Sequence, residues 1–258
     1  MDSNGHESKR RRGIYLLPNL FTTIALFFGF FAIVSANGDQ FGVAAVCIFV
    51  AMVFDSLDGR VARLTNTQSD FGVQYDSIAD MVSFGVAPAL VIYEWALHSL
   101  ASMGPTWGKS GWLGAFTYTA CAGLRLARFN TMVGIVDKKY FQGLPSPAAA
   151  AAVVSLVWVG DELNARGWPV GLVAWVLTVT AALLMVSNIR YYSFKEFDFR
   201  YRVPFVTIVI VVLAVAFAMI NPPMVLFLVF LTYLVSGPVI TITGLRAQRR
   251  AKRGGIPE

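Results

Sequence analysis

The chain alternates long apolar runs with short polar connections, and this alternation predicts a series of membrane-spanning helices. A helix needs about 20 apolar residues to cross the hydrocarbon core of a bilayer. Eight runs approach that length: approximately Tyr15 to Ala36, Phe41 to Ala62, Tyr75 to His98, Trp112 to Phe129, Pro145 to Gly160, Pro169 to Ile189, Val203 to Ile220 and Met224 to Thr243. The fifth run is the shortest. Because backbone groups in lipid must bond within their own segment, we expect an all-α, polytopic integral membrane protein with about eight transmembrane helices.

The composition supports this interpretation. Of the 258 residues, 56% are hydrophobic and 14% are charged, and the mean hydropathy is +0.61. These values are typical of a polytopic membrane protein. No polar region between the apolar runs is long enough to fold by itself. We therefore expect one transmembrane domain, residues 14–245, between two basic tails, residues 1–13 and 246–258.

The basic residues indicate how the helices are oriented. If both termini are inside, nineteen Lys and Arg residues face the cytoplasm, and only Lys109 and Arg166 fall outside. The positive-inside rule favours this topology, in which both termini and the connection between the second and third runs are cytoplasmic. The net charge of +6 does not indicate nucleic-acid binding, because the basic residues flank apolar runs without a nucleic-acid motif between them. Contact with anionic lipid headgroups explains them better.

Four aspartates gather in the stretch from Asp55 to Asp80, where the second and third runs meet. Asp55 and Asp58 are three residues apart, and Asp76 and Asp80 are four apart. Both members of each pair therefore project from one face of a helix. The residues between the pairs, Leu64 to Phe71, are polar and lack a helical pattern, which predicts a helix, a cytoplasmic turn and a second helix. This hairpin would bring the two acid pairs together.

Four carboxylates at the edge of a low-dielectric slab repel one another unless a cation neutralises them. Oxygen ligands favour hard ions such as Mg²⁺, Mn²⁺ or Ca²⁺, and no His or Cys in the stretch suggests zinc. Four carboxylates suit two metal ions that together hold the oxygens of a phosphoryl transfer. The alternative is structural, with the acids capping helices and pairing with Arg60 and Arg63.

The stretch also follows a longer pattern, D-x-x-D-G-x-x-A-R, eight residues, then G-x-x-x-D-x-x-x-D. The pattern is occupied by Asp55, Asp58, Gly59, Ala62, Arg63, Gly72, Asp76 and Asp80. In every position it resembles the motif of the CDP-alcohol phosphatidyltransferases, integral membrane enzymes that transfer a phosphatidyl or related group from a CDP-linked donor to an alcohol. Eight matched positions within 26 residues make the resemblance highly specific. It implies a helical bundle like that of the family, with residues 14–245 as the catalytic domain.

The resemblance implies a role for each motif residue. Asp55 and Asp76 would bridge two divalent cations, Mg²⁺ or Mn²⁺, with Asp58 completing one site and Asp80 the other. Asp80 would also be the general base. Small residues let a nucleotide approach the helix backbone closely, and arginine offers a planar fork to phosphate oxygens. The implied contacts to the CDP-diacylglycerol donor are Asn19, Thr22, Gly59, Ala62, Arg63, Ser69 and Gly72.

Two further segments resemble the branch of the family that uses serine as the acceptor. These are LRLARFN, which contains Arg125 and Arg128 three residues apart, and YFQGLPSPAAA from Tyr140. Serine carries a carboxylate, for which a guanidinium is a suited partner, so both arginines are candidate serine contacts. The alternative is that they anchor the protein at the cytoplasmic surface or pair with Asp137. Glycerol 3-phosphate, inositol phosphate and choline remain alternative acceptors, and a cation transporter is a remote alternative.

The resemblance carries three further expectations. The enzyme would act in phospholipid biosynthesis in the bacterial inner membrane, with its active site on the cytoplasmic side. It would form a homodimer through its membrane spans. Its partners would be the two substrates and the surrounding membrane lipids, and not nucleic acid.

Overall fold

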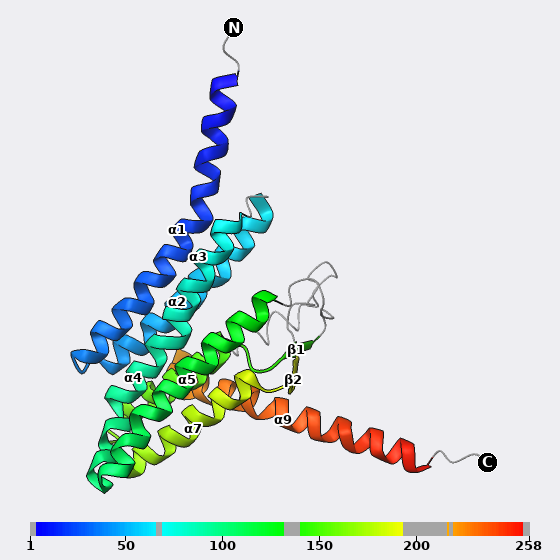
Figure 1. The fold of residues 1–258 in the computed structure, drawn as a ribbon. Coiled ribbons are helices and arrows are strands. Elements are labelled where there is room, and N and C mark those ends of the chain that lie inside the picture. The colour runs from blue at the N-terminus through cyan, green and yellow to red at the C-terminus, as the bar shows by residue number, and fades with distance from the viewer. Residues whose placement is uncertain (1–3, 66–68, 132–139, 193–215, 217–218, 255–258) are drawn as a thin grey trace.

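The computed structural model describes residues 4–65, 69–131, 140–192, 216 and 219–254, and these are almost entirely helical (Figure 1). In chain order the elements are α1 (Asn4–Asn37), α2 (Phe41–Thr65), α3 (Asp70–Asp80), the π-helical segment η1 (Met81–Val86), α4 (Ala87–Trp95), the 3-10 helix η2 (Leu97–Met103), α5 (Pro105–Thr131), β1 (Tyr140–Gln142), α6 (Ser146–Glu162), α7 (Trp168–Val186), β2 (Arg190–Tyr192) and α9 (Pro222–Gly254). The expected all-α fold is confirmed for the described residues, with one short strand pair added to it.

Five segments of the described chain are long and apolar enough to cross a membrane. They are Leu17–Asn37, Phe41–Leu64, Asp70–Trp95, Trp168–Val186 and Pro222–Thr243, and they correspond to the first, second, third, sixth and eighth predicted runs. The protein is therefore an integral membrane protein, as expected, but the count of eight spans is not confirmed.

The remaining three predicted runs differ in their outcome. The run at Trp112 to Phe129 lies in α5, where glycine, threonine, tyrosine and arginine interrupt the apolar residues. The run at Pro145 to Gly160 lies in α6, which has only 17 residues. The run at Val203 to Ile220 lies almost wholly outside the described residues.

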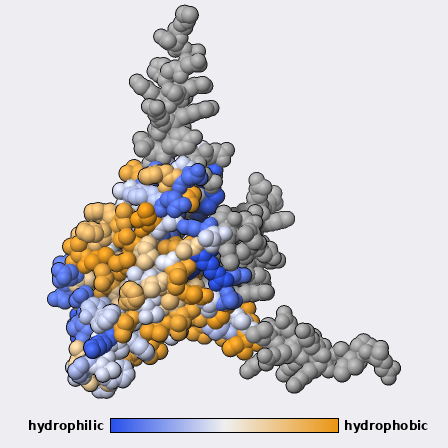
Figure 2. Space-filling model, viewed as in Figure 1, coloured by the Kyte–Doolittle hydropathy of each residue, from blue (hydrophilic) through white to orange (hydrophobic). Residues whose placement is uncertain are grey.

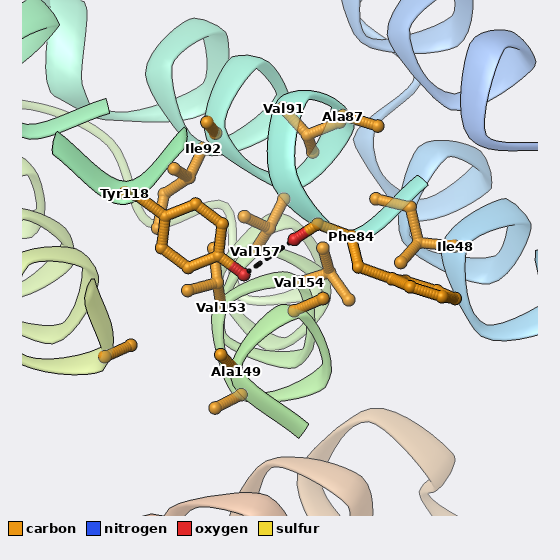
Figure 3. Close-up of a cluster of buried hydrophobic side chains, with 14 of the residues drawn as sticks. Ile48, Phe84, Ala87, Val91, Ile92, Tyr118, Ala149, Val153, Val154 and Val157 are labelled. Carbon is orange, nitrogen blue, oxygen red and sulfur yellow. Dashed lines mark hydrogen bonds between the residues drawn. The ribbon is translucent and has the colours of Figure 1, made fainter. Parts of the chain in front are cut away.

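The short helix α6 forms the centre of the bundle, since it packs against α2, α4, α7 and α9. Its residues from Ala149 to Ser155 are all buried. Figure 3 shows Val153, Val154 and Val157 of α6 among side chains from α2, η1, α4 and α5. A helix surrounded by protein does not need to span the lipid with its own apolar surface. The alanine-rich sequence allows the neighbouring helices to approach closely.

Helices α1 and α2 form a long pair that lies against α3 and η1. Three residues join the pair, and Asp39 in this turn has a left-handed backbone with φ 58°, which aspartate tolerates better than most residues. From α2 the chain returns along Asp70–Trp95, so α1, α2 and α3 lie side by side (Figure 1). The last residues of α2 and the first residues of α3 lie at the same end of the bundle as the N-terminal half of α1. This arrangement confirms the predicted helical hairpin.

The strand pair joins the segments that follow α5 and α7. Strands β1 and β2 are antiparallel, with Phe141 opposite Tyr191. Gly143 follows β1 with a φ of 79°, and its missing side chain allows the Met185 carbonyl to lie against it. The sequence predicts an interfacial elbow from Arg190 to Arg202. Its first three residues form β2, and the rest lies outside the described residues.

The surface of the protein is divided into apolar and polar regions. Figure 2 shows hydrophobic side chains over the body of the bundle and hydrophilic ones gathered toward its opposite ends. Many large apolar side chains are exposed, including Phe27 at 57%, Phe116 at 61% and Val173 at 61%. Exposed apolar area of this extent on a folded chain is the surface that lipid covers.

Candidate metal centre

The aspartates of the motif lie on two neighbouring helices, α2 and α3. Asp55 lies ten residues before the last residue of α2, Thr65, and Asp80 lies ten residues after the first residue of α3, Asp70. At 1.5 Å per residue these two acids are therefore about 15 Å along the helices from the turn. Both acids therefore lie along the body of their helices, away from the ends of α2 and α3 beside the turn.

Three of the four carboxylates converge. Asp55, Asp76 and Asp80 each offer an oxygen within 4.8 Å of the oxygens of the other two, a spacing that could hold a metal ion. One oxygen of Asp76 and one of Asp80 are buried without a hydrogen-bond partner in the described part of the chain. Buried carboxylate oxygens normally have partners, since leaving them unpaired is costly. An oxygen-only donor set with unpaired buried oxygens fits a hard divalent cation.

The fourth aspartate, Asp58, lies beside this group but outside it. Its Oδ2 accepts a 2.6 Å hydrogen bond from the hydroxyl of Thr22 on α1, and both residues are buried. Asp58 is close enough to Asp76 and Asp80 for their charges to interact. Thr22 thus fixes the orientation of the Asp58 carboxylate through Oδ2, and the other carboxylate oxygen, Oδ1, takes no part in this bond.

The structural alternative, in which the acids pair with nearby arginines, is not supported. Across residues 4–65 and 69–131, no ion pair joins the four aspartates to Arg60 or Arg63, and both arginines are exposed. Arg63 lies near the backbone of Gly59, where a Cβ added to the glycine would be 3.8 Å from Arg63 Nη1. Its guanidinium therefore stands over the small-residue face of α2, which Ala62, three residues from Gly59, shares.

Three of the residues expected to contact the donor lie together, one on α1 and two at the start of α3. A Cβ placed on Gly72 would lie 3.4 Å from Asn19 Oδ1 of α1 and 3.1 Å from Ser69 Oγ. Ser69 is the N-cap of α3 and accepts a hydrogen bond from the Gly72 N–H at 3.1 Å. Ser69 therefore has a structural role in starting the helix. Asn19 and Gly72 both lie close to Ser69 at the start of α3.

The two candidate arginines of α5 have different surroundings. Arg125 donates from Nη1 to Ser146 Oγ of α6 at 2.6 Å, and its buried Nε has no partner among the described residues. Its strongest interaction with a charged group is with Asp80. Arg125 thus lies between the carboxylates and the start of α6.

Arg128 is bonded to the segments around the strand pair. It donates from Nη2 to Gln142 Oε1 at 2.6 Å and to Asn188 Oδ1 at 2.7 Å, and from Nη1 to the Val186 carbonyl at 3.4 Å. These bonds tie the end of α5 to β1 and to the end of α7. The alternative partner Asp137 lies outside the described residues.

Ser146 and Asn130 are polar residues near the acids that sequence reasoning missed. Ser146 is 1% exposed and orients Arg125. The available signal was a serine between two prolines, at the start of an apolar helix. Asn130 donates to Ser77 Oγ at 3.0 Å, next to Asp76. No pattern in the sequence pointed to that contact, which depends on how α5 packs near α3.

Together, these features describe an integral membrane protein with a partly buried cluster of carboxylates, on two helices, that could hold a metal ion. Residues 15–186, two thirds of the chain and all of the acidic stretch, match the family model described as CDP-alcohol phosphatidyltransferase. The chain belongs to this family. It is therefore an enzyme of the phosphatidyltransferase class.

Curated relatives from distant organisms are also similar to the chain. A Helicobacter pylori protein named CDP-diacylglycerol--serine O-phosphatidyltransferase is 39% identical over 183 residues, covering 71% of this chain and 74% of the relative. A Mycobacterium tuberculosis protein of the same name is 30% identical over 246 residues, covering 93% and 82%. An archaetidylserine synthase of Methanothermobacter thermautotrophicus is 32% identical over 190 residues, covering 71% and 72%.

Proposed function

We propose that the protein transfers the phosphatidyl group of CDP-diacylglycerol to the hydroxyl of L-serine, giving phosphatidylserine and CMP in phospholipid biosynthesis. The observation that carries the proposal is the convergence of Asp55, Asp76 and Asp80, within 4.8 Å of one another, on the two helices of the family motif. The names of the three relatives support serine as the acceptor.

In the proposed reaction Asp55, Asp58, Asp76 and Asp80 would hold two divalent cations, Mg²⁺ or Mn²⁺. Bound cations supply charge that holds the donor diphosphate and offsets the negative charge of the transition state. Asp80 accepts the proton of the serine hydroxyl. The serine oxygen then forms a bond to the phosphorus that carries the diacylglycerol, and the bond from that phosphorus to the CMP oxygen breaks.

The proposed donor site uses the seven residues that the family resemblance implies, from α1, α2 and the start of α3. Asn19, Ser69 and Gly72 are adjacent, and Gly59, Ala62 and Arg63 offer a small-residue face with a guanidinium beside it. Thr22 contributes through its bond to Asp58. A nucleotide diphosphate reaching the acids along this face would meet Arg63 on the exposed part of α2.

The proposed acceptor site uses Arg125 and Arg128. Arg125 has a buried N–H without a partner and is close to Asp80, so a carboxylate bound there would leave the serine hydroxyl near the base. Arg128 already donates to three acceptors. A serine carboxylate would have to share or replace one of these bonds, so its role is weaker in this proposal than that of Arg125.

The proposed topology has eight membrane spans, with both termini and the active site on the cytoplasmic side of the bacterial inner membrane. The distribution of Lys and Arg supports it. The basic tails, residues 1–13 and 246–258, flank the catalytic domain. We also propose a homodimer through the membrane spans, as expected for the family. Single-cysteine labelling from each side of the membrane tests the topology, and light scattering in detergent tests the dimer.

The chemistry is tested by CMP release from CDP-diacylglycerol and serine in detergent with Mn²⁺ or Mg²⁺. We expect Asp80→Asn to abolish release because the amide cannot accept the proton. Asp161→Asn is the matched control, since Asp161 is a partly buried aspartate that pairs with Arg166 in the segment between α6 and α7. Normal turnover by Asp80→Asn would refute the assignment of the base.

The acceptor is tested with a panel of radiolabelled alcohols offered with CDP-diacylglycerol: serine, glycerol 3-phosphate, inositol phosphate and choline. Serine alone should yield labelled lipid. Arg125→Gln should raise the KM for serine while leaving the KM for CDP-diacylglycerol near that of the wild type. Incorporation of another alcohol at a higher rate would replace serine in the proposal without changing the reaction class.

A further inference from the structure

The helix that carries Asp76 and Asp80 changes its geometry directly after Asp80. Residues Met81–Val86 form a π-helical segment, and the Ala87 N–H bonds to the Val82 carbonyl, five residues earlier. Bonds in an α-helix reach four residues back. One extra residue in a turn rotates everything beyond it by roughly 100° about the helix axis. The π segment therefore sets the angle between the acids of α3 and the core-facing residues of α4.

Pro88 follows this segment and has no N–H, so the carbonyl four or five residues earlier, of Phe84 or Ser83, lacks one backbone donor. The hydroxyl of Tyr118 on α5 donates to the Phe84 carbonyl at 3.1 Å, as the dashed line in Figure 3 shows. Tyr118 is 0% exposed and Phe84 1%, so water cannot replace the bond.

The same segment is held from its other side by α1. Ser83 Oγ donates to the Ala25 carbonyl at 3.1 Å. Gly29 of α1 passes so close that an added Cβ would lie 2.5 Å from Ser83 Oγ. The π segment is thus fixed between α1 and α5, and Tyr118 provides the α5 contact at the Phe84 carbonyl.

We propose that Tyr118 is a positioning residue for the metal centre: its hydroxyl bonds to the Phe84 carbonyl, holds the π segment, and thereby holds Asp80 at the angle at which its carboxylate meets Asp55 and Asp76. The proposal rests on the proposed metal-dependent transfer. Tyr118 acts through the backbone of Phe84 and does not touch substrate. Loss of the hydroxyl removes a buried hydrogen bond to this backbone, which favours a change in the local helical geometry.

The test is Tyr118→Phe, which keeps the ring and removes only the hydroxyl. Tyr191→Phe is the matched control, because Tyr191 is also 0% exposed and its hydroxyl donates to the Leu234 carbonyl of α9 at 3.0 Å. The readout is the binding of Mn²⁺ alone, without substrates, followed by the electron paramagnetic resonance signal of free Mn²⁺ in detergent solution. Thermal unfolding of both variants gives their stabilities.

We expect both variants to lose similar stability, but only Tyr118→Phe to bind Mn²⁺ less tightly, by roughly three- to tenfold for the loss of one buried hydrogen bond. Equal Mn²⁺ binding by Tyr118→Phe and the wild type would overturn the inference, as would equal weakening in Tyr191→Phe. If Tyr118→Phe does not fold, Ser83→Ala carries the same expectation from the α1 side. A wild-type protein that binds no Mn²⁺ would instead refute the proposed metal-dependent function.

Discussion

The bond between Thr22 and Asp58 offers a sharp quantitative test of how the acidic site is held. Thr22→Val replaces the hydroxyl by a methyl group of similar size and leaves Asp58 Oδ2 without its 2.6 Å donor. Thr22 is 4% exposed and Asp58 5%, so solvent cannot supply a substitute. The change removes this buried hydrogen bond to a carboxylate, together with a longer 3.2 Å contact from the same hydroxyl to the Pro18 carbonyl of its own helix.

Hydrogen bonds to charged groups contribute about 1.5–3 kcal/mol. At 1.4 kcal/mol per factor of ten, this range corresponds to a decrease of roughly 10- to 150-fold in kcat/KM for CDP-diacylglycerol. The lower end applies if Asp58 turns toward another donor, and the upper end if it stays unpaired. Thr22→Ser, which keeps a hydroxyl at the same position, should recover most of the loss.

The assay is CMP release at saturating serine with Mn²⁺ present, over a range of CDP-diacylglycerol concentrations. Thr178→Val is the matched control, because Thr178 is 0% exposed and its hydroxyl donates only to the Ala174 carbonyl of its own helix at 2.7 Å. It should keep kcat/KM within about twofold, because that bond is remote from any carboxylate. The reasoning is refuted if Thr22→Val and Thr178→Val have the same kcat/KM, or if Thr22→Ser is as impaired as Thr22→Val.

Further predictions concern packing, the cations and the second arginine. Gly29→Ala should lower the free energy of unfolding by about 1–3 kcal/mol, since its Cβ would lie 2.8 Å from Ser83 Cα. Gly38→Ala, whose nearest neighbour would be 3.5 Å away, should change it little in the same thermal unfolding measurement. Chelation of divalent cations should abolish CMP release, and Mn²⁺ or Mg²⁺ should restore it while monovalent cations do not. Arg128→Ala should raise the KM for serine more than the KM for CDP-diacylglycerol. An unchanged KM for serine would mean that Arg128 does not bind serine and serves only to connect α5 to its neighbouring segments.

Local pattern was sufficient to predict the helices and the acidic hairpin. Runs such as Phe41 to Ala62 are apolar because they face lipid or neighbouring helices, so composition alone predicts their structure. The spacing of Asp76 and Asp80 placed them on one face because the helical period is a property of the backbone. The limits appear at α6, whose apolar sequence did not show that other helices surround it, because burial within protein and burial in lipid select the same apolar residues.

Local sequence pattern could not predict which side chains contact one another across helices. Thr22 and Asp58 are 36 residues apart, and Arg125 and Ser146 are 21 apart. Each contact depends on which faces of two helices meet. The bond from Tyr118 to the Phe84 carbonyl spans 34 residues and likewise depends on the packing of α5.

The sequence by itself determined the membrane character of the protein, its family and the identity of the acids, because hydropathy, helical period and motif spacing are local properties of the chain. Only the tertiary structure decided which three carboxylates converge, that Thr22 holds the fourth, and how far the cluster lies inside the bundle. Those features arise from the rotation and depth of each helix against its neighbours, which are set by contacts between residues distant in the chain.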